Sequence, residues 1–363
     1  MILNIFARYS PTHASTRVRF LQFVPALEAA GFEVRHFTIV EDSAVRGTRN
    51  VAGIVWLRLI SFFRVVRQLQ SLPPDSLLHV HIELFPWVPY FIERRLLRLL
   101  GPKKYSIELD DAWFHHYESH GSKLVTFFLG TKIDSLMKGA TAVIAGNRYI
   151  AERAIAAGAR DVAIIPSVVD ADRYVRMRSQ SEEARQDAPK KLVIGWIGLP
   201  ATTKYLVAKR AVIETLHSSG LAKFIAIGAD AEQLKDIPVT VVAWVESEEV
   251  HALRGFDIGI MPLTDSPFER GKCGYKLIQY MACGLPVVAS PIGVNSEIVL
   301  DGESGFLASV DSEWITRLTQ LCTHADLREK LGTVGLRRMI DRYSSAAIAP
   351  HLVSVFLGIR DQS

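Results

Sequence analysis

The feature that most limits how this chain can fold is a regular alternation of short apolar, β-branched runs with longer amphipathic segments. Such alternation builds a parallel sheet with helices on both faces, because each apolar run has the length of a buried strand and each amphipathic segment buries one side. The strands expected in the first half are Ile2–Ala7, Glu33–Ile39, Leu77–Ile82, Tyr105–Leu109, Thr141–Ala145 and Val162–Ile165. Helical patterns fill the intervals at about 15–30, 52–70, 87–100, 122–138 and 147–157.

The alternation stops once and then restarts. Residues 176–191 are polar, charged and nearly free of apolar anchors, as is typical of a linker. Further strands are expected at Leu192–Ile197, Phe224–Ile227, Val239–Val242, Ile258–Met261 and Pro286–Ala289. The fold class is therefore α/β, with two Rossmann-like doubly wound parallel-sheet domains facing a central cleft. We expect a first domain over 1–168, a crossover and linker over 169–191, a second domain over 192–343, and a C-terminal helix over 344–363 that packs back on the first domain.

Composition agrees with a globular chain of two domains. Apolar residues make up 49% and charged residues 22% of the 363 positions, and about 150 residues per domain predicts two domains. The chain has three cysteines, a number that is too small for a disulfide framework and leaves one cysteine without a pair. This indicates a reducing compartment. The opening MILNIFARYS has no basic-then-apolar leader, and no clean apolar run reaches 18 residues. We therefore expect a cytoplasmic protein.

The net charge of +4 hides an uneven distribution of charged residues. Residues 1–168 carry 20 Lys and Arg against 14 Asp and Glu, and the stretch 46–104 alone carries 10 against 3. A local basic field favours an anionic partner, either a phosphate-bearing substrate or a membrane surface. Nucleic acid is not expected, because no basic stripe is interleaved with aromatic residues.

The segment with the most chemical information runs from Met261 to Phe306. It predicts a strand, a basic Gly-rich loop, a short helix that begins near Tyr275 and ends at Gly284, and a second strand. Glycines let backbone amides approach a ligand, and a helix N-terminus directs its N–H groups and positive dipole end at an anion. A diphosphate held there by Lys272, Gly274, Tyr275 and Lys276 is the functional interpretation. A surface loop with two solvated lysines is the alternative.

At this segment the sequence resembles the family 4 nucleotide-sugar glycosyltransferases (glycosyl transferases group 1), which have the GT-B fold. The tract KLIQYMACGLPVVASPIGVNSEIV followed by DGESGFL carries the resemblance. The family often has two glutamates eight positions apart, the first on the donor sugar and the second on the ribose. This chain has Gly271 and Gln279 at those positions. The amide of Gln279 can still bind a ribose hydroxyl, and Glu269 is the expected substitute at the sugar.

The resemblance implies further donor contacts in the second domain. In IGWIGLPATTKYL the residues Gly198, Thr203 and Lys204 match the family's glycine loop and basic phosphate ligand. Trp244 and Val245 fall where the family contacts the base, although simple packing is an equal alternative for Trp244.

Acceptor-side candidates come from the first domain. Ser15 and Arg17 match the family's opening loop and helix, where Arg can hold a phosphate, although Ser15 as a plain N-cap is the alternative. Asp110 and Asp111 follow a predicted strand and can orient the acceptor hydroxyl, take its proton or bind a cation; one of them can instead cap the next turn. His115 is a further candidate for polarising a hydroxyl. The resemblance implies no metal and no cofactor, with the nucleotide diphosphate sugar as co-substrate.

Two basic segments, 54–70 and 91–104, combine apolar and cationic residues in the manner of a membrane-surface patch. In 54–70 we expect Arg64, Arg67 and Gln68 opposite a broad apolar face. The alternative is two helices that pack on the sheet with basic outer faces.

The sequence thus predicts an enzyme that moves a glycosyl group from a nucleotide diphosphate sugar to a lipid-linked or polysaccharide precursor, with retention of configuration implied by the resemblance. Two alternatives stay open. The first is a nucleotide-sugar epimerase or hydrolase on the same scaffold. The second is a non-catalytic nucleotide-sugar-binding assembly partner.

Overall fold

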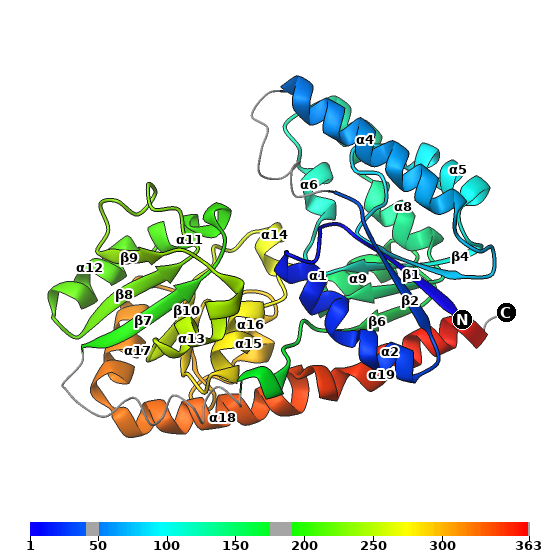
Figure 1. Cartoon of the computed structure of the whole chain (residues 1–363). Helices are drawn as coiled ribbons and strands as arrows, with labels where there is room; N and C mark the ends of the chain where they lie inside the picture. The colour runs from blue at the N-terminus through cyan, green and yellow to red at the C-terminus, as the bar shows by residue number, and fades with distance from the viewer. Residues whose placement is uncertain (41–50, 175–190, 362–363) are drawn as a thin grey trace. The chain divides into compact units, whose positions relative to one another are not determined.

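A computed structural model describes residues 1–40, 51–174 and 191–361 (Figure 1). These residues form two compact units, each built on its own sheet. The first unit comprises Met1–Ser167, Arg270–Cys273 and Ile348–Ser363; the second comprises Val168–Glu269 and Gly274–Ala347. Of the predicted linker, positions 175–190 lie outside the described residues.

The first unit contains a six-stranded, fully parallel sheet in the order β2-β1-β3-β4-β5-β6. Its strands are β1 Ile2–Ala7, β2 Glu33–Thr38, β3 Leu77–His81, β4 Lys104–Leu109, β5 Ala142–Ala145 and β6 Val162–Ile164. The strand predictions for this half are confirmed to within one residue at each end. The central strands β3 and β5 are buried at every position, as expected for strands covered on both faces.

Helices of the first unit follow the predicted segments with two breaks. They are α1 Ala14–Arg19, the 3₁₀ turn η1 Leu21–Phe23, α2 Val24–Ala29, α4 Val51–Gln70, α5 Tyr90–Leu100, α6 Phe114–Glu118, α7 Lys123–Leu129, α8 Lys132–Gly139 and α9 Arg148–Ala156. The segment predicted as one helix over 122–138 is two, separated at Gly130 and Thr131. The segment 15–30 is likewise divided, because Phe20 leaves the helical conformation (φ −126°).

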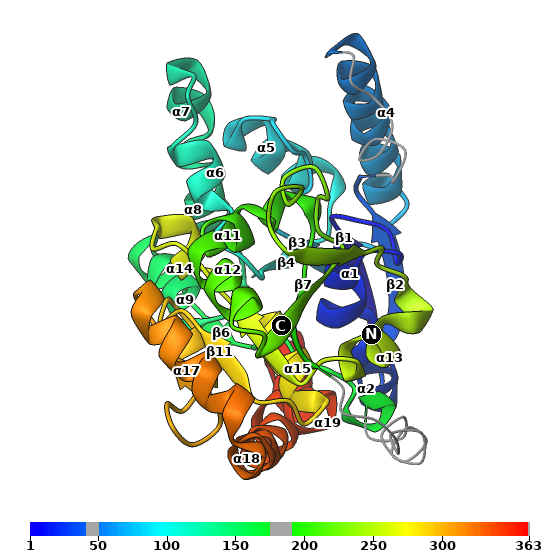
Figure 2. The same cartoon turned by 90° about the vertical axis from the view of Figure 1, so that its left-hand side faces the viewer.

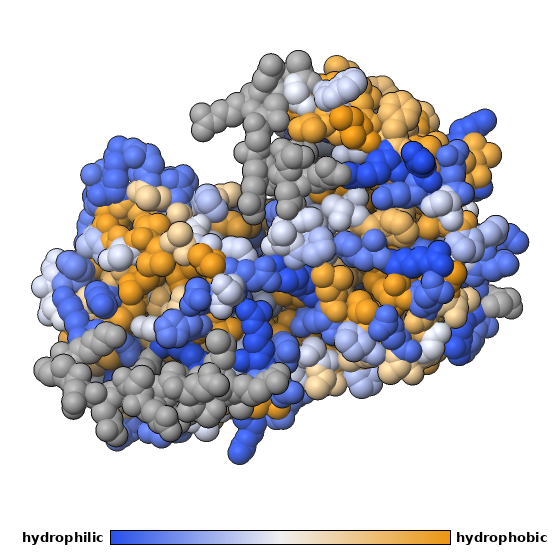
Figure 3. All heavy atoms as spheres, in the orientation of Figure 1, coloured by the Kyte–Doolittle hydropathy of each residue, from blue (hydrophilic) through white to orange (hydrophobic). Residues whose placement is uncertain are grey.

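Helix α4 differs from the prediction at Arg64, which was expected to lie with Arg67 opposite the broad apolar face. Arg64 turns inward and donates to the carbonyl oxygens of Thr38 and Ile39, at 3.3 and 2.9 Å. Val65 and Leu69 are buried beside it, while Trp56 and Phe63 are exposed. Hydrophobic residues are visible on the surface at the upper end of α4 (Figure 3). The exposed side of α4 therefore carries both apolar residues and the cations Arg58 and Arg67, while Arg64 is turned away from it.

The second unit holds another six-stranded parallel sheet, in the order β12-β11-β10-β7-β8-β9. Its strands are β7 Leu192–Ile197, β8 Ala222–Ile227, β9 Val239–Val242, β10 Ile258–Met261, β11 Val287–Ala289 and β12 Phe306–Leu307. Val193 and Ile197 of β7 enter one apolar cluster, whereas Ile194 and Trp196 enter another. Because neighbouring strand residues point to opposite faces, this sheet is buried on both sides.

Helices cover both faces of the second sheet. They are η3 Pro200–Thr202, α11 Lys204–Val207, α12 Arg210–Ser218, η4 Glu246–Glu248, α13 Glu249–Arg254, α14 Pro267–Arg270, α15 Tyr275–Ala282, α16 Asn295–Ile298, α17 Asp311–Thr323 and α18 Ala325–Tyr343. Helix α15 begins and ends where the sequence predicts, with Gly284 at a positive φ of 72° just after it. A glycine in this left-handed conformation is a common helix stop.

The last helix, α19 Ser345–Asp361, returns the chain to the first unit from Ile348 onward. There Phe356 is buried, with its ring 6.2 Å from that of Phe32 and 5.0 Å from that of His79. Lys104 donates to the carbonyl oxygen of Ile359 at 3.0 Å. Within 1–40, 51–174 and 191–361, no helix has the length and apolar content needed to cross a membrane.

Candidate active site

The strand order of the second sheet indicates where a ligand binds in that unit. Strands β8 and β9 lie on one side of β7, and β10, β11 and β12 lie on the other. In open parallel sheets, ligands bind beyond the carboxyl ends of the strands at the point where the order reverses. Here that point lies between β7 and β10, and the first residue after β7 is Gly198.

Gly198 and Lys276 lie side by side at this point. The Lys276 ammonium lies 4.1 Å from the ring centroid of Trp196. A Cβ added at Gly198 would lie 2.7 Å from the Lys276 Nζ and 2.3 Å from the Trp196 ring. The lack of a side chain at Gly198 therefore makes room for the amine at the end of β7, where a cation stabilises an anionic ligand.

The N-terminus of α15 supplies a second positive feature of the same unit. Gly274, its N-cap, has φ 65°, and a Cβ there would lie 2.3 Å from the Ile298 Cδ1. The chain turns tightly at this glycine and enters an eight-residue helix whose dipole places partial positive charge at Tyr275.

Thr203 and Lys204 of the predicted phosphate loop have different environments. The Thr203 side chain is fully buried, and its hydroxyl oxygen accepts the Asp230 N–H at 2.9 Å. This hydrogen bond joins the loop to the chain that follows β8, and a contact of Thr203 with a donor phosphate stays a prediction. Lys204 keeps 61% of its side chain exposed, with Nζ 3.5 Å from Glu269.

Glu269 is held inside the second unit. Tyr205 and Ser266 donate their hydroxyl hydrogens to its carboxylate, and little of the side chain is exposed. Burial opposes its negative charge, but these two hydrogen bonds keep the pKa of Glu269 below its usual value. The carboxylate is thus ionised and fixed in orientation.

Gln279, which is predicted to bind the ribose, is buried, and its side chain is hydrogen-bonded to other residues of the second unit. Its Nε2 donates to Glu249 at 3.0 Å and to the Tyr174 hydroxyl at 3.3 Å. The other oxygen of Glu249 accepts the indole N–H of Trp244 at 2.8 Å. Glu249 therefore joins the two predicted nucleoside residues, Gln279 and Trp244, in one hydrogen-bonded group, while Val245 next to Trp244 is half exposed.

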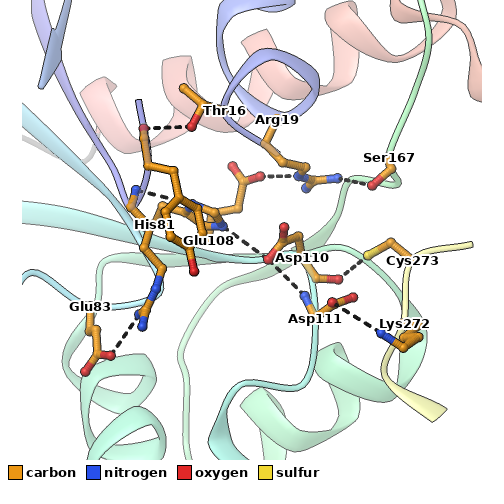
Figure 4. A network of polar contacts seen from close by, with 12 residues as sticks. Thr16, Arg19, His81, Glu83, Glu108, Asp110, Asp111, Ser167, Lys272 and Cys273 are labelled. Atoms are coloured by element: carbon orange, nitrogen blue, oxygen red, sulfur yellow. Dashed lines mark hydrogen bonds and ion pairs between the residues drawn. The ribbon is translucent and has the colours of Figure 1, made fainter. Parts of the chain in front are cut away.

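Lys272 belongs to the first unit, which includes Arg270–Cys273, whereas the other predicted diphosphate residues belong to the second unit. Its Nζ is 3.9 Å from an oxygen of Asp111 (Figure 4). The loop is fixed there by Asn147, which donates to the carbonyl oxygens of Gly271 and Lys272, and by the Cys273 thiol, which donates to the carbonyl oxygen of Asp110.

Asp110 and Asp111 directly follow β4, so the strand has ended before either side chain begins. His81 Nε2 lies 3.1 Å from Asp110, and the Asp111 N–H donates to the same carboxylate at 3.0 Å. Burial opposes the charge of Asp110, but His81 and Arg19 lower its pKa below the usual value. Burial next to the ionised Asp110 raises the pKa of Asp111 to about 6, although Lys272 opposes the shift.

A buried ionic cluster supports the same edge of the first sheet. Glu83 accepts from Arg8 at 3.0 Å and from Lys132 at 2.6 Å, and Glu93 lies 2.9 Å from the Lys132 ammonium. The backbone between β3 and this cluster is strained: Ile82 has φ 69°, and the Glu83 N–H donates to the His81 carbonyl oxygen. A β-branched residue in this conformation is rare, and such strain gathers at functional sites.

The remaining acceptor-side candidates are distributed around the first unit. Arg17 donates to the carbonyl oxygens of Pro11 and Thr12. Ser15 lies inside α1, whose N-cap is His13, so the N-cap interpretation of Ser15 is wrong. Arg19, which follows Arg17 on the same helix, is buried and paired with Glu108. His115 bonds Tyr149 at 2.8 Å and Glu118 at 2.9 Å.

Sequence reasoning missed Arg8, His81, Asn147 and Glu249. Arg8 and Asn147 follow predicted strands, so the rule that ligands gather at carboxyl ends of parallel strands is a signal that could have found them. His81 ends β3 and so lies at the same edge of the sheet, whereas Glu249 carried no such signal, because its partners are fixed by helix packing.

Known proteins resemble this chain in sequence over part of its length and in fold over nearly all of it. Residues 191–324 match the family model described as glycosyl transferases group 1. No curated protein sequence matches the chain. Sucrose-phosphate synthase from Thermosynechococcus elongatus is 16% identical, with 100% of both chains covered and a TM-score of 0.72. Anabaena HepE, solved with UDP and glucose, is 15% identical, with 99% of this chain and 100% of that chain covered and a TM-score of 0.67.

WaaG, a glycosyltransferase involved in lipopolysaccharide biosynthesis, is 10% identical, with 98% of this chain and 99% of that chain covered and a TM-score of 0.62. These similarities establish the GT-B fold for the chain.

Proposed function

We propose, from the match of residues 191–324 to the glycosyl transferases group 1 model, that this protein transfers a glycosyl group from a nucleotide diphosphate sugar. The observation that carries the proposal is the Lys276 ammonium beside Gly198, at the reversal point of the second sheet. A diphosphate is the common ligand that matches a helix N-terminus and a lysine at such a point. The complex of HepE with UDP supports a uridine donor as the first one to test.

In this proposal the second unit stabilises the leaving group. When the glycosidic bond to the diphosphate breaks, negative charge develops on the departing phosphate oxygen. Lys276 and the dipole of α15 are already oriented toward that region, so they stabilise the charge without reorganising. Lys204 adds an exposed cation on the same unit, and the buried Glu269 fixes its position.

We assign orientation of the acceptor to the first unit. Asp110 is committed to His81 and stays ionised, so its role is to position the turn after β4. Asp111 keeps about a third of its side chain exposed, 31%, and has the raised pKa of a group that can exchange a proton near neutral pH. It is the better of the two to accept a hydrogen bond from the acceptor hydroxyl.

The acceptor in this proposal is a lipid-linked or polysaccharide precursor, and transfer retains the anomeric configuration. The lipopolysaccharide role of WaaG supports a lipid-linked acceptor, and so do the outward apolar face of α4 and the exposed arginines of α5. We propose a peripheral contact of segments 54–70 and 91–104 with an anionic membrane, on its cytoplasmic side. The nucleotide diphosphate sugar serves as co-substrate, without a metal or other cofactor.

A thermal-shift screen of UDP, GDP and ADP with their glucose conjugates tests donor binding. A ligand at one hundred times its Kd raises the free energy of unfolding by about 2.7 kcal/mol, so one base is expected to stand out. The preferred donor is then incubated with membrane extract, with and without EDTA, and nucleotide release is followed. Acceptor-dependent release that EDTA does not change is the expected result; NMR of the product gives its anomeric configuration.

Two other outcomes identify the alternatives. Conversion or hydrolysis of the donor without acceptor indicates an epimerase or hydrolase. Binding without turnover against every acceptor pool indicates a nucleotide-sugar-binding partner, an outcome that the hydrogen-bonded state of Gln279 and Glu269 makes worth testing. If no nucleotide stabilises the protein, the proposal fails.

A further inference from the structure

We infer that α7 is a membrane-inserting element which, together with α4, docks the first unit on an anionic bilayer. The inference extends the membrane contact of the proposed function and rests on that function for what the contact is used for. The docking itself is tested by vesicle binding, without an activity assay. Neither segment 54–70 nor segment 91–104 includes α7, so this assigns a new part of the chain to the surface.

Helix α7 presents an unpartnered apolar stripe. Leu124, Phe127 and Phe128 are 70%, 79% and 52% exposed, and their spacing puts them on one side of the helix. Exposure of three large apolar side chains on a helix of seven residues is unfavourable, because removing apolar surface from water is stabilising. Binding of a partner that covers these three side chains would be favoured by their removal from water.

Helix α4 presents a longer stripe of the same kind. Trp56 and Phe63 are 64% and 66% exposed, and Val55 just before them and Leu59 and Ile60 between them are close to half exposed. Figure 2 shows α4 and α7 projecting from the first unit in the same direction, away from its sheet. Two separate projecting stripes suit a fluid, planar partner better than one folded protein surface.

An aromatic and cationic bridge connects the two helices. The Arg58 guanidinium of α4 lies 4.9 Å from the ring centroid of Trp87. On the α6–α7 side, the rings of His116 and His120 lie 5.8 and 5.6 Å from the same indole. Trp87 has φ 68°, an uncommon backbone conformation outside glycine that the surrounding contacts must hold. Trp, His and Arg are residues of the polar–apolar boundary of a bilayer.

The charges of these helices select an anionic surface. Exposed cations stand at Arg58 and Arg67 of α4, at Arg94, Arg95 and Arg98 of α5, and at Lys123 of α7. The one carboxylate of these three described helices, Glu93, is buried against Lys132. Cations near an anionic leaflet are attracted to its headgroups, and apolar insertion adds to that attraction, so the two features act together on lipid headgroups and acyl chains.

The test is flotation of the full chain with vesicles of phosphatidylcholine alone or with 30% phosphatidylglycerol (about one anionic lipid in three, enough for an anionic surface). Three variants are compared: Phe127→Ser/Phe128→Ser in α7, Trp56→Ser/Phe63→Ser in α4, and Ile155→Ser as control. Ile155 is 63% exposed in the same unit but lies on α9. All replaced side chains are exposed, so the fold is expected to persist.

We expect wild type and Ile155→Ser to bind the anionic vesicles, with binding reduced by salt, and each of the two double variants to partition about tenfold or more weakly. Nucleotide-induced thermal stabilisation is expected to be the same in all four proteins, which separates docking from donor binding. Wild-type binding by the α7 variant would overturn the role of α7. Absence of wild-type binding, or equal binding to both vesicle types, would overturn the anionic bilayer as partner.

Discussion

At the scale of single residues, Lys276 carries most of the electrostatic argument for the second unit. Its ammonium lies over the Trp196 ring, so its position is set before any ligand arrives. We expect Lys276→Ala to weaken binding of the preferred nucleoside diphosphate by about 1–3 kcal/mol, because a charge-assisted contact is lost. Isothermal titration measures the change. Lys235→Ala is the matched control, since Lys235 is an exposed lysine of the same unit paired with Glu232; an equal effect of both variants would remove Lys276 from the site.

Asp111 gives a second prediction at this scale, through its titration. Its pKa in the folded protein is about 6, against about 3.9 in an unfolded chain. Between these values the folded protein holds a proton that the unfolded chain has released, so this group's contribution to stability is complete below about pH 4 and is lost as the pH rises through 6. Asp111→Asn is expected to melt above wild type at pH 7.5 and level with it near pH 4.

Thermal melts across that range check the sign of the effect. A constant difference between the two proteins at every pH would show that Asp111 does not titrate in this window. If Asp111 also accepts the acceptor's proton, wild-type kcat/KM falls below about pH 6, and Asp111→Asn has a low rate without that acid limb.

At the scale of elements, the turn into α15 depends on one glycine. Gly274 has φ 65°, and a Cβ there would lie 2.3 Å from Ile298 and 3.1 Å from Val294. Gly274→Ala is therefore expected to destabilise the fold by about 2–4 kcal/mol, through backbone strain and overpacking together. Gly302→Ala separates the two causes, because Gly302 has φ 77° but nothing within 4 Å of a new Cβ. Urea unfolding of both variants measures the difference; equal losses would mean that packing of α16 on this turn contributes nothing.

How much of each element the sequence predicts depends on how local its causes are. β1 and β7 are specified by their own apolar runs, and their predicted bounds are confirmed. β12 was missed because Phe306 and Leu307 form a strand only through pairing with Val288 and Ala289. The inward position of Arg64 in α4 was also missed, because it depends on two carbonyl oxygens at the end of β2.

The same distinction applies to the site. Gly198 and Asp110 could be predicted because they follow strands. The pairing of Gln279 with Glu249 could not, because thirty residues and two further elements separate them along the chain. Tertiary packing decides which buried side chains become hydrogen-bond partners. The spacing of residues along the sequence does not predict these pairs.

At the scale of the whole molecule, the two ends of the chain belong to one unit. Phe356 of α19 is 1% exposed and packs on Phe32 and His79, and the chain reaches it only after the entire second unit has been built. Stability of the first sheet therefore depends on residues at the far end of the sequence.

Phe356→Ala tests this dependence. Removing a buried phenylalanine is expected to cost about 3–5 kcal/mol. The loss should appear in the first unit alone, so hydrogen–deuterium exchange is expected to rise in peptides of β1, β2 and β3 and to stay unchanged in peptides from 192–269 and 274–343. Val334→Ala on α18 is the control, because Val334 is 37% exposed and lies in the second unit. Faster exchange in β7 and β10 of Phe356→Ala would mean that the two units unfold as one, and that α19 stabilises both.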